Sequence, residues 1–117
     1  LLYGIPGVPL AQGQNLMDGH ILSALTEALM NGWIVEPLYL TGALSVATAI
    51  AVMHLTKTTH PPGGATALIA VIGSERVHQL GFLYVLSPVA LRALIMLVVA
   101  LIVNNLTSFR IYLVFWW

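Results

Sequence analysis

Two consecutive prolines stand in the middle of a largely apolar chain, in the run Thr-His-Pro-Pro-Gly-Gly-Ala-Thr-Ala-Leu at residues 59–68. Proline lacks a backbone N–H and has a fixed φ, so the pair cannot continue a preceding helix, although it is tolerated in the first turn of a new one. The run therefore predicts that one helix ends before His60 and that a short helix begins between Pro62 and Ala65. This helix should end at Gly73, which makes it too short for the roughly 20 residues that cross a bilayer.

The composition is that of an integral membrane protein. Of the 117 residues, 59% are hydrophobic and 7% are charged, whereas soluble domains carry about 25% charged residues. The formal net charge is zero, which offers no electrostatic basis for nucleic-acid binding. The chain has no cysteine, which excludes disulfides and thiolate catalysis. The hydrolase motifs G-x-S-x-G and H-E-x-x-H do not occur, so we expect no enzymatic activity.

The apolar segments predict an all-α membrane protein with a single domain over residues 1–117. We expect a bundle of about three transmembrane helices, near residues 16–35, 38–56 and 84–105, with the short helix re-entrant. The second of these helices is rich in small residues, which permit close packing in lipid, so we expect it at the centre. The polar run at residues 74–79 should lie outside the hydrocarbon. Four aromatic residues near the C-terminus suit an interfacial belt: Tyr112, Phe115, Trp116 and Trp117.

The short helix is the expected binding site. A helix shortened by proline and glycine is the best sequence marker of a site in transporter-like membrane proteins. Its first N–H groups and the positive end of its dipole favour an anion. Gly63 and Gly64 would allow close backbone approach to a ligand, and Thr66 could add a hydroxyl donor. The alternative is a structural helix break in which His60 binds a backbone carbonyl.

Three histidines lie near predicted helix ends, at His20, His54 and His60. They could relay protons, because imidazole titrates near neutrality. They could instead bind zinc or form only local hydrogen bonds. No two of them have the i, i+4 spacing of a helical metal motif, so we expect neither a metal nor a cofactor.

Two opposite charges, Glu27 and Arg92, fall within the predicted spans. Ionisable residues in spans face the bundle interior and usually pair, so one expectation is a Glu27–Arg92 ion pair. The other interpretations are that Arg92 lines the path of an anion, or that its side chain snorkels to the interface.

The run His-Pro-Pro-Gly-Gly-Ala-Thr-Ala-Leu at residues 60–68 resembles the motif for which the HPP family of integral membrane proteins is named. The resemblance covers essentially the whole chain through these further stretches: Pro9-Leu10-Ala11-Gln12, Gly19-His20 with Ser23-Ala24, Met53-His54-Leu55-Thr56, Tyr84 with Pro88, and Asn104-Asn105. The chain departs from the family pattern at Gly13-Gln14, where Pro-Arg is usual, and at Asp18, Glu27 and Arg92.

The resemblance implies a multi-helix membrane protein, in the bacterial inner membrane rather than a plastid envelope, whose N-terminal helices precede this sequence. Because some members are implicated in nitrite transport, it implies a transporter or channel subunit for a small inorganic anion, with nitrite as the candidate. A homo-oligomer in the lipid bilayer or the preceding helices would complete the path. The alternative function is a non-transporting structural or regulatory membrane module.

The predicted substrate site contains no catalytic or metal-binding residue. It consists of the motif residues His60, Pro61, Pro62, Gly63, Gly64, Ala65 and Thr66, with His20, His54 and Arg92 as neighbouring walls.

Overall fold

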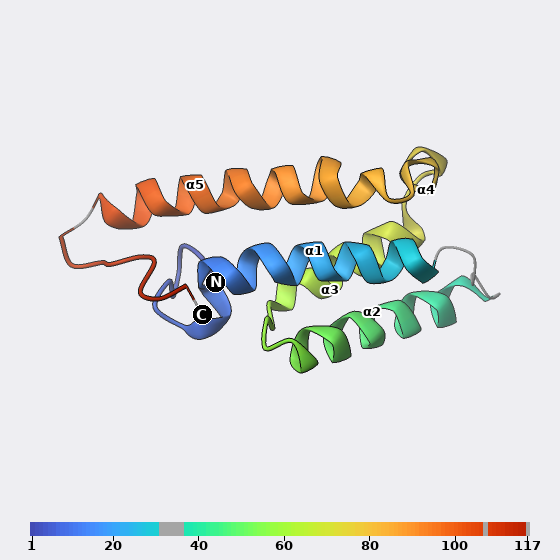
Figure 1. The fold of residues 1–117 in the computed structure, drawn as a ribbon, viewed down its shortest axis with the longest axis horizontal. Helices are drawn as coiled ribbons and strands as arrows, with labels where there is room; N and C mark the ends of the chain where they lie inside the picture. The colour runs from blue at the N-terminus through green and yellow to red at the C-terminus, as the bar shows by residue number, and fades with distance from the viewer. Residues whose placement is uncertain (31–36, 107, 117) are drawn as a thin grey trace.

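The chain folds into an elongated bundle of helices whose extents are 51 × 26 × 19 Å. This computed structural model describes residues 1–30, 37–106 and 108–116. Over these residues the regular elements are all helical: a short 3₁₀ turn at Pro9–Ala11, α1 at Gly13–Met30, α2 at Leu38–Leu55, α3 at Pro61–Ile72, α4 at Glu75–Leu80, a π-type segment at Val85–Ala90 and α5 at Leu91–Asn105 (Figure 1). The predicted end of the first helix falls at residues 31–36, outside the described residues.

Two of the helical segments are long and apolar enough to cross a membrane, Leu38–Leu55 and Val85–Asn105. This is fewer than the three spans that we predicted. Helix α1 has 18 residues, the same length as α2, but it is not apolar enough to count as a candidate membrane span. It carries the polar residues Asn15, Ser23 and Glu27 on buried positions. The first predicted span is therefore a polar helix that depends on its protein neighbours.

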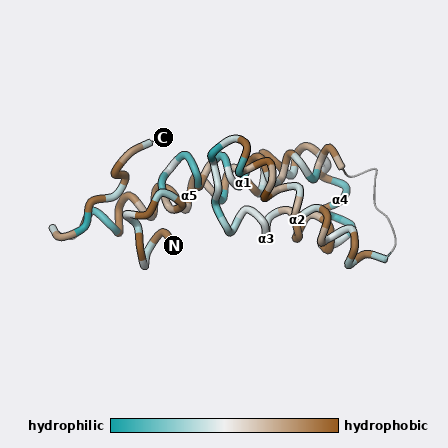
Figure 2. Tube along the Cα trace, turned by 90° about the horizontal axis from the view of Figure 1, so that it is seen from below, coloured by the Kyte–Doolittle hydropathy of each residue, from teal (hydrophilic) through white to brown (hydrophobic). Residues whose placement is uncertain are grey.

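Helix α1, and not α2 as predicted, lies at the centre of the bundle. It contacts α2, α3, α5 and the Val85–Ala90 segment, and α2 and α5 lie on opposite sides of it (Figure 1). Some small residues of α2 are buried in the bundle, Gly42, Ser45 and Ala49, whereas others, Ala43, Ala47 and Ala51, are exposed. The rest of α2 is apolar and exposed, as is most of α5 (Figure 2). Polar α1 is central because its polar side chains need partners that lipid cannot supply.

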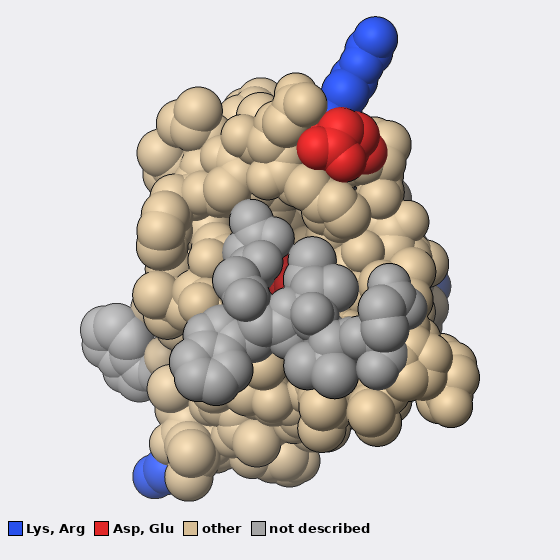
Figure 3. Space-filling model, turned by 90° about the vertical axis from the view of Figure 1, so that its right-hand side faces the viewer, with Lys and Arg blue, Asp and Glu red and all other residues tan. Residues whose placement is uncertain are grey.

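Helix α3 follows the predicted bounds closely. His60 is its N-cap, Pro61 and Pro62 form its first turn, and Gly73 is its C-cap. The helix has 12 residues, fewer than the roughly 20 that cross a bilayer, and its re-entrant placement stays a prediction. It runs antiparallel to α2 and carries the chain to α4, at the opposite end of the bundle from the end of α2 (Figure 1). The polar run at residues 74–79 forms the short helix α4 at that end, a region with few charged atoms on its surface (Figure 3).

The turn between α2 and α3 is built on Lys57. The N–H of Lys57 donates to the carbonyl of His54 at 3.2 Å, and the N–H of Thr58 donates to the carbonyl of Met53 at 2.9 Å. This is the pattern of a Schellman motif, whose turning residue adopts a left-handed conformation that favours glycine. Lys57 takes that position with φ of 59°.

The predicted third span is interrupted near its start. Ser87 has extended dihedrals of −139° and 117° inside the Val85–Ala90 segment, and α5 begins only at Leu91. Pro88 explains the break. A proline inside a helix has no N–H to donate to the carbonyl four residues earlier, and it disfavours helical dihedrals at the preceding residue.

The two ends of the chain are joined to each other beside the start of α1. The side-chain oxygen of Gln12 accepts from the N–H of Val114 at 3.0 Å, and the hydroxyl of Tyr112 donates to the carbonyl of Ala11 at 2.7 Å. Tyr112 is buried, so it does not belong to the predicted interfacial aromatic belt, whereas Phe115 and Trp116 are exposed. Trp117 lies outside the described residues.

Candidate functional site

The histidine of the His-Pro-Pro motif connects the start of α3 to the segment that precedes α1. His60 is 0% exposed, and its Nδ1 lies 2.7 Å from the carbonyl oxygen of Leu10. Because a carbonyl can only accept, Nδ1 carries the proton and donates. This contact is the local structural role that we had set against an anion site.

The backbone donors predicted to hold an anion are not free. Pro61 and Pro62 have no N–H, and the N–H of Gly63 donates to the carbonyl of His60 at 2.8 Å. Gly64, Ala65 and Thr66 follow within α3, where N–H groups bond to carbonyls four residues earlier. The prediction that an anion meets the N–H groups of residues 63–66 is therefore wrong for this geometry.

The first glycine of the motif allows two helices to approach closely. A Cβ on Gly63 would lie 2.7 Å from the carbonyl oxygen of Gly19 on α1, and one on Gly19 would lie 2.6 Å from Cβ of His60. A Cβ on Gly64 would make ordinary contacts with the side chains of Val46 and Ile50 on α2, at 3.6 and 4.0 Å. Gly63 therefore permits the close packing of α3 on α1. A Cβ at either glycine would meet protein atoms rather than an open space.

A cavity of about 250 Å³ lies further along α3, between α1, α3 and α5. Three of the predicted site residues line it, His20, Thr66 and Arg92, although they come from three different helices. Tyr84 and Pro88 also line it. The remaining lining side chains are Ile69, Val77, Val89, Ala93 and Met96.

Hydrogen bonds hold the polar wall of this cavity. Nδ1 of His20 lies 2.7 Å from the hydroxyl oxygen of Thr66, and the hydroxyl of Tyr84 donates to the carbonyl of Thr66 at 3.2 Å. Nε2 of His20 is buried and has no hydrogen-bond partner. The ring of His20 also meets the ring of His60 edge-on, with centroids 5.1 Å apart.

The cavity does not include every residue that we predicted. His54 is exposed on α2 with its Nδ1 3.4 Å from the hydroxyl of Thr59. His60, Gly63 and Gly64 are buried nearby without lining the cavity. Over the described residues no group of three histidine or acidic side chains could hold a metal ion, so the convergence of His20, His54 and His60 required by a metal site does not occur.

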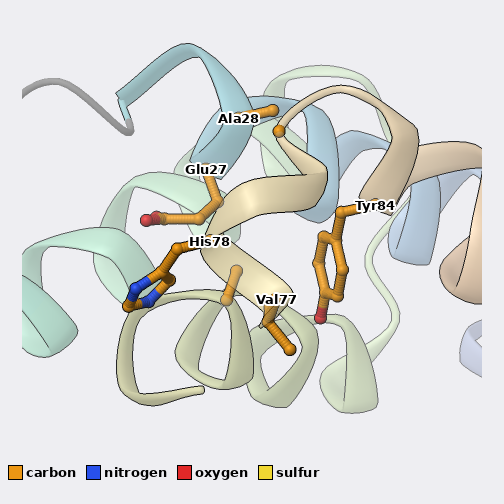
Figure 4. A pocket seen from close by; sticks show the side chains of 7 residues that line it. Glu27, Ala28, Val77, His78 and Tyr84 are labelled. Atoms are coloured by element: carbon orange, nitrogen blue, oxygen red, sulfur yellow. The ribbon is translucent and has the colours of Figure 1, made fainter. Parts of the chain in front are cut away.

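Glu27 and Arg92 do not form the predicted ion pair. Within the described residues no contact joins them. Arg92 lines the 250 Å³ cavity, whereas Glu27 lines a separate cavity of about 20 Å³. Tyr84 lines both cavities, and Figure 4 shows its ring on the other side of the smaller cavity from the side chain of Glu27.

Sequence reasoning missed Tyr84 as a site residue. It appeared in the family resemblance together with Pro88, but a tyrosine before an apolar helix carries no chemical signal of its own. The signal that could have found it is the break at Pro88, because an irregular backbone beside a membrane helix is tolerated where it is buried in protein or lines a cavity.

The sequence matches the family described as HPP, transmembrane region, over residues 1–113. It is similar to two proteins of Dictyostelium discoideum that are named only as transmembrane proteins, with 48% and 42% identity over the whole of this chain. The chain spans 38% of the length of the first relative and 42% of the second. No solved structure matches it. The match covers nearly every residue of the fold and of both cavities, and the chain therefore belongs to the HPP family of membrane proteins.

Proposed function

We propose that this domain forms part of a transport path for a small inorganic anion, with nitrite as the candidate substrate, and that the anion binds in the cavity of His20, Thr66 and Arg92. The observation that carries the proposal is the composition of this cavity. Arg92 and two side chains with hydrogen-bond donors, His20 and Thr66, line one space in a chain of which only 7% is charged, and Arg92 itself is exposed.

The His20–Thr66 hydrogen bond leaves one polar hydrogen of the pair unused in either protonation pattern. If Thr66 donates to Nδ1 of His20, Nε2 carries the ring proton and points its N–H away from that bond. If Nδ1 donates to Thr66, the hydroxyl hydrogen of Thr66 is left for another acceptor. This hydrogen is on the buried Nε2 of His20 in the first case and on the hydroxyl of Thr66, which lines the cavity, in the second, so the second pattern is the one that suits anion binding.

Arg92 supplies the charge. Its guanidinium is always protonated and presents a planar fork of donors that matches a planar oxyanion. Charged residues within membrane segments commonly mark ion pathways. The cavity of about 250 Å³ is also large enough for a triatomic ion with some water, since a water molecule occupies about 30 Å³ in the liquid.

The path requires more protein than this cavity. The chain covers less than half of its relatives' length, and the apolar faces of α2 and α5 are exposed. We propose that further helices of the full-length protein or a second copy complete it within the lipid bilayer, without metal, cofactor or enzymatic chemistry. The bacterial inner membrane stays a prediction.

The test is anion uptake into proteoliposomes that contain the full-length protein, with nitrite, nitrate and chloride compared. We expect selective uptake that Arg92→Gln reduces at least tenfold and that His20→Ala also reduces. Arg76→Gln is the matched control, because Arg76 is exposed on α4 and lines neither cavity. Uptake equal to that of empty liposomes for every anion would reject the proposal.

The second candidate is a non-transporting structural or regulatory module. It is favoured by the bond from His60 to Leu10 and the close contact of Gly63 with Gly19, which make the motif a packing device. It predicts that Arg92→Gln and Arg76→Gln behave alike in every assay.

A further inference from the structure

Glu27 lies in a water-sized cavity at the α4 end of the bundle. Its side chain is 5% exposed, and its Oε2 is buried with no hydrogen-bond partner. The cavity of about 20 Å³ exceeds the roughly 10–15 Å³ that one water molecule requires. In Figure 4 the side chains of Glu27 and His78 project to the same side, and the ring of Tyr84 stands across from them.

The other groups that face this cavity do not neutralise the carboxylate. The titratable ones are His78 on α4 and Tyr84. Nε2 of His78 is 3.0 Å from the carbonyl of Val71, and the hydroxyl of Tyr84 donates to Thr66. From α3 only Ala70 faces the cavity, and the described part of α2 contributes no lining residue. No lysine or arginine within the described residues lines it.

A single proton is the partner that fits such a site. Burial of an ionised carboxylate without a partner is costly, and a bound proton removes the charge. Hard metal cations instead take about six oxygen ligands, and here the walls are mostly hydrocarbon, from Ala28, Ala70 and Val77.

We propose that Glu27 is an exchangeable proton site, reached by water past His78, and that its protonation favours anion binding in the neighbouring cavity; the second part rests on the proposed transport function. Protonation forms one O–H bond on the carboxylate and breaks no bond in the protein. Tyr84 and Val77 line both cavities, so one wall separates the proton site from the anion site.

The coupling follows from electrostatics. Tyr84 is within electrostatic range of both Glu27 and Arg92. An ionised Glu27 lowers the positive potential that Arg92 creates for an anion, and protonation removes that opposition. Linkage is reciprocal, so a bound anion also favours the proton on Glu27. The two ligands together carry no net charge.

The proton site is tested without transport, by infrared spectra of the purified full-length protein as a function of pH. As pH falls, one component of the carboxylic-acid C=O band should appear in the wild-type protein and in Glu75→Gln and be missing from Glu27→Gln. Glu75 is the matched control because it is an exposed acid on α4. If the band of Glu27→Gln equals that of the wild-type protein at every pH, the proton site is wrong.

The coupling is tested by nitrite uptake into proteoliposomes, after subtraction of the leak into empty liposomes. An inward proton gradient should raise uptake several-fold in the wild-type protein and in Glu75→Gln, whereas Glu27→Gln should retain downhill uptake with no response to the gradient. Stimulation by a sodium gradient at uniform pH, lost in Glu27→Gln, would overturn the assignment to a proton. An unchanged gradient response in Glu27→Gln would overturn the coupling.

The two proposals fail separately. If the infrared band is assigned to Glu27 but no anion enters the liposomes, the transport function is wrong and the proton site stands. If anions enter but the band does not depend on Glu27, the proton site is wrong and the transport function stands.

Discussion

Nδ1 of His60 lies 2.7 Å from the carbonyl oxygen of Leu10, a residue fifty positions earlier in the chain. The bond joins the break before α3 to the turn before α1. His60 of the His-Pro-Pro motif therefore connects the N-terminal ends of these two helices. The cavity lined by His20, Thr66 and Arg92 begins beyond it, where the ring of His60 meets the ring of His20.

Replacement of this histidine should destabilise the protein. His60→Ala removes the bond to Leu10 and leaves a void at a fully buried position, so we expect a loss of about 2–4 kcal/mol in the free energy of unfolding. His54→Ala is the matched control, because His54 is exposed on α2. Unfolding of both variants in detergent would measure the difference, and equal stability of the two would contradict the structural role of His60.

The two glycines of the motif should respond oppositely to alanine. Gly63→Ala places a Cβ 2.7 Å from the backbone oxygen of Gly19, which cannot move without shifting α1, so we expect destabilisation by about 1–3 kcal/mol. Gly64→Ala makes an ordinary contact at 3.6 Å from Val46 and gains helix propensity of up to about 1 kcal/mol. Thermal unfolding of the two variants is the measurement. The packing of α3 on α1 is not as close as described if Gly63→Ala is the more stable variant.

Replacement of Lys57 by glycine should stabilise the protein. Its φ of 59° is strained for a residue with a side chain, so Lys57→Gly should raise the free energy of unfolding by about 1 kcal/mol. Lys57→Ala keeps the Cβ and serves as the control, with no such gain. Chemical unfolding distinguishes them, and a gain of the same size in Lys57→Ala would assign the effect to the lost charge instead.

The bond from Tyr112 to Ala11 should contribute to stability, since Tyr112→Phe leaves a buried carbonyl without its donor. We expect a loss of about 1 kcal/mol in the free energy of unfolding. Tyr39→Phe is the control, because Tyr39 is 80% exposed.

The same residue predicts a pH dependence. Burial raises the pKa of the Tyr112 phenol, so the folded state keeps its proton at a pH where the unfolded state, with a pKa of about 10, has lost it. The contribution is fully present below about pH 10 and decreases as pH rises above it. The stability advantage of the wild-type protein over Tyr112→Phe should therefore shrink in strongly alkaline solution. An advantage that grows there would contradict the burial of this hydroxyl.

Helix boundaries near prolines and glycines could be predicted from local sequence. Helix α2 starts at Leu38 and α3 ends at Ile72 as expected, because Pro37 and Gly73 act on their own dihedrals and on those of adjacent residues. The Schellman turn at Lys57 was missed, since lysine gives no signal for a left-handed conformation. The break at Ser87 was missed as well, because Pro88 was expected to fit the first turns of an uninterrupted helix.

The candidate site could be predicted only in part. The structure brings three of the predicted residues to one cavity, His20, Thr66 and Arg92, and their role in binding stays a prediction. The predicted donor at Gly63 was wrong, because its N–H already donates to the carbonyl of His60. Whether an N–H is free depends on such carbonyl acceptors in the preceding turn.

By itself, the sequence determined that this protein lies in a membrane, that it is helical, and that its chain breaks at His60. These properties follow from side-chain transfer energies and from the dihedral limits of proline, which act within a few residues. The tertiary structure alone decided that polar α1 is central, that Glu27 and Arg92 line two separate cavities, and that the larger cavity forms beyond the motif. The physical reason is that burial and charge pairing depend on which distant helices pack together, and local sequence does not encode those contacts.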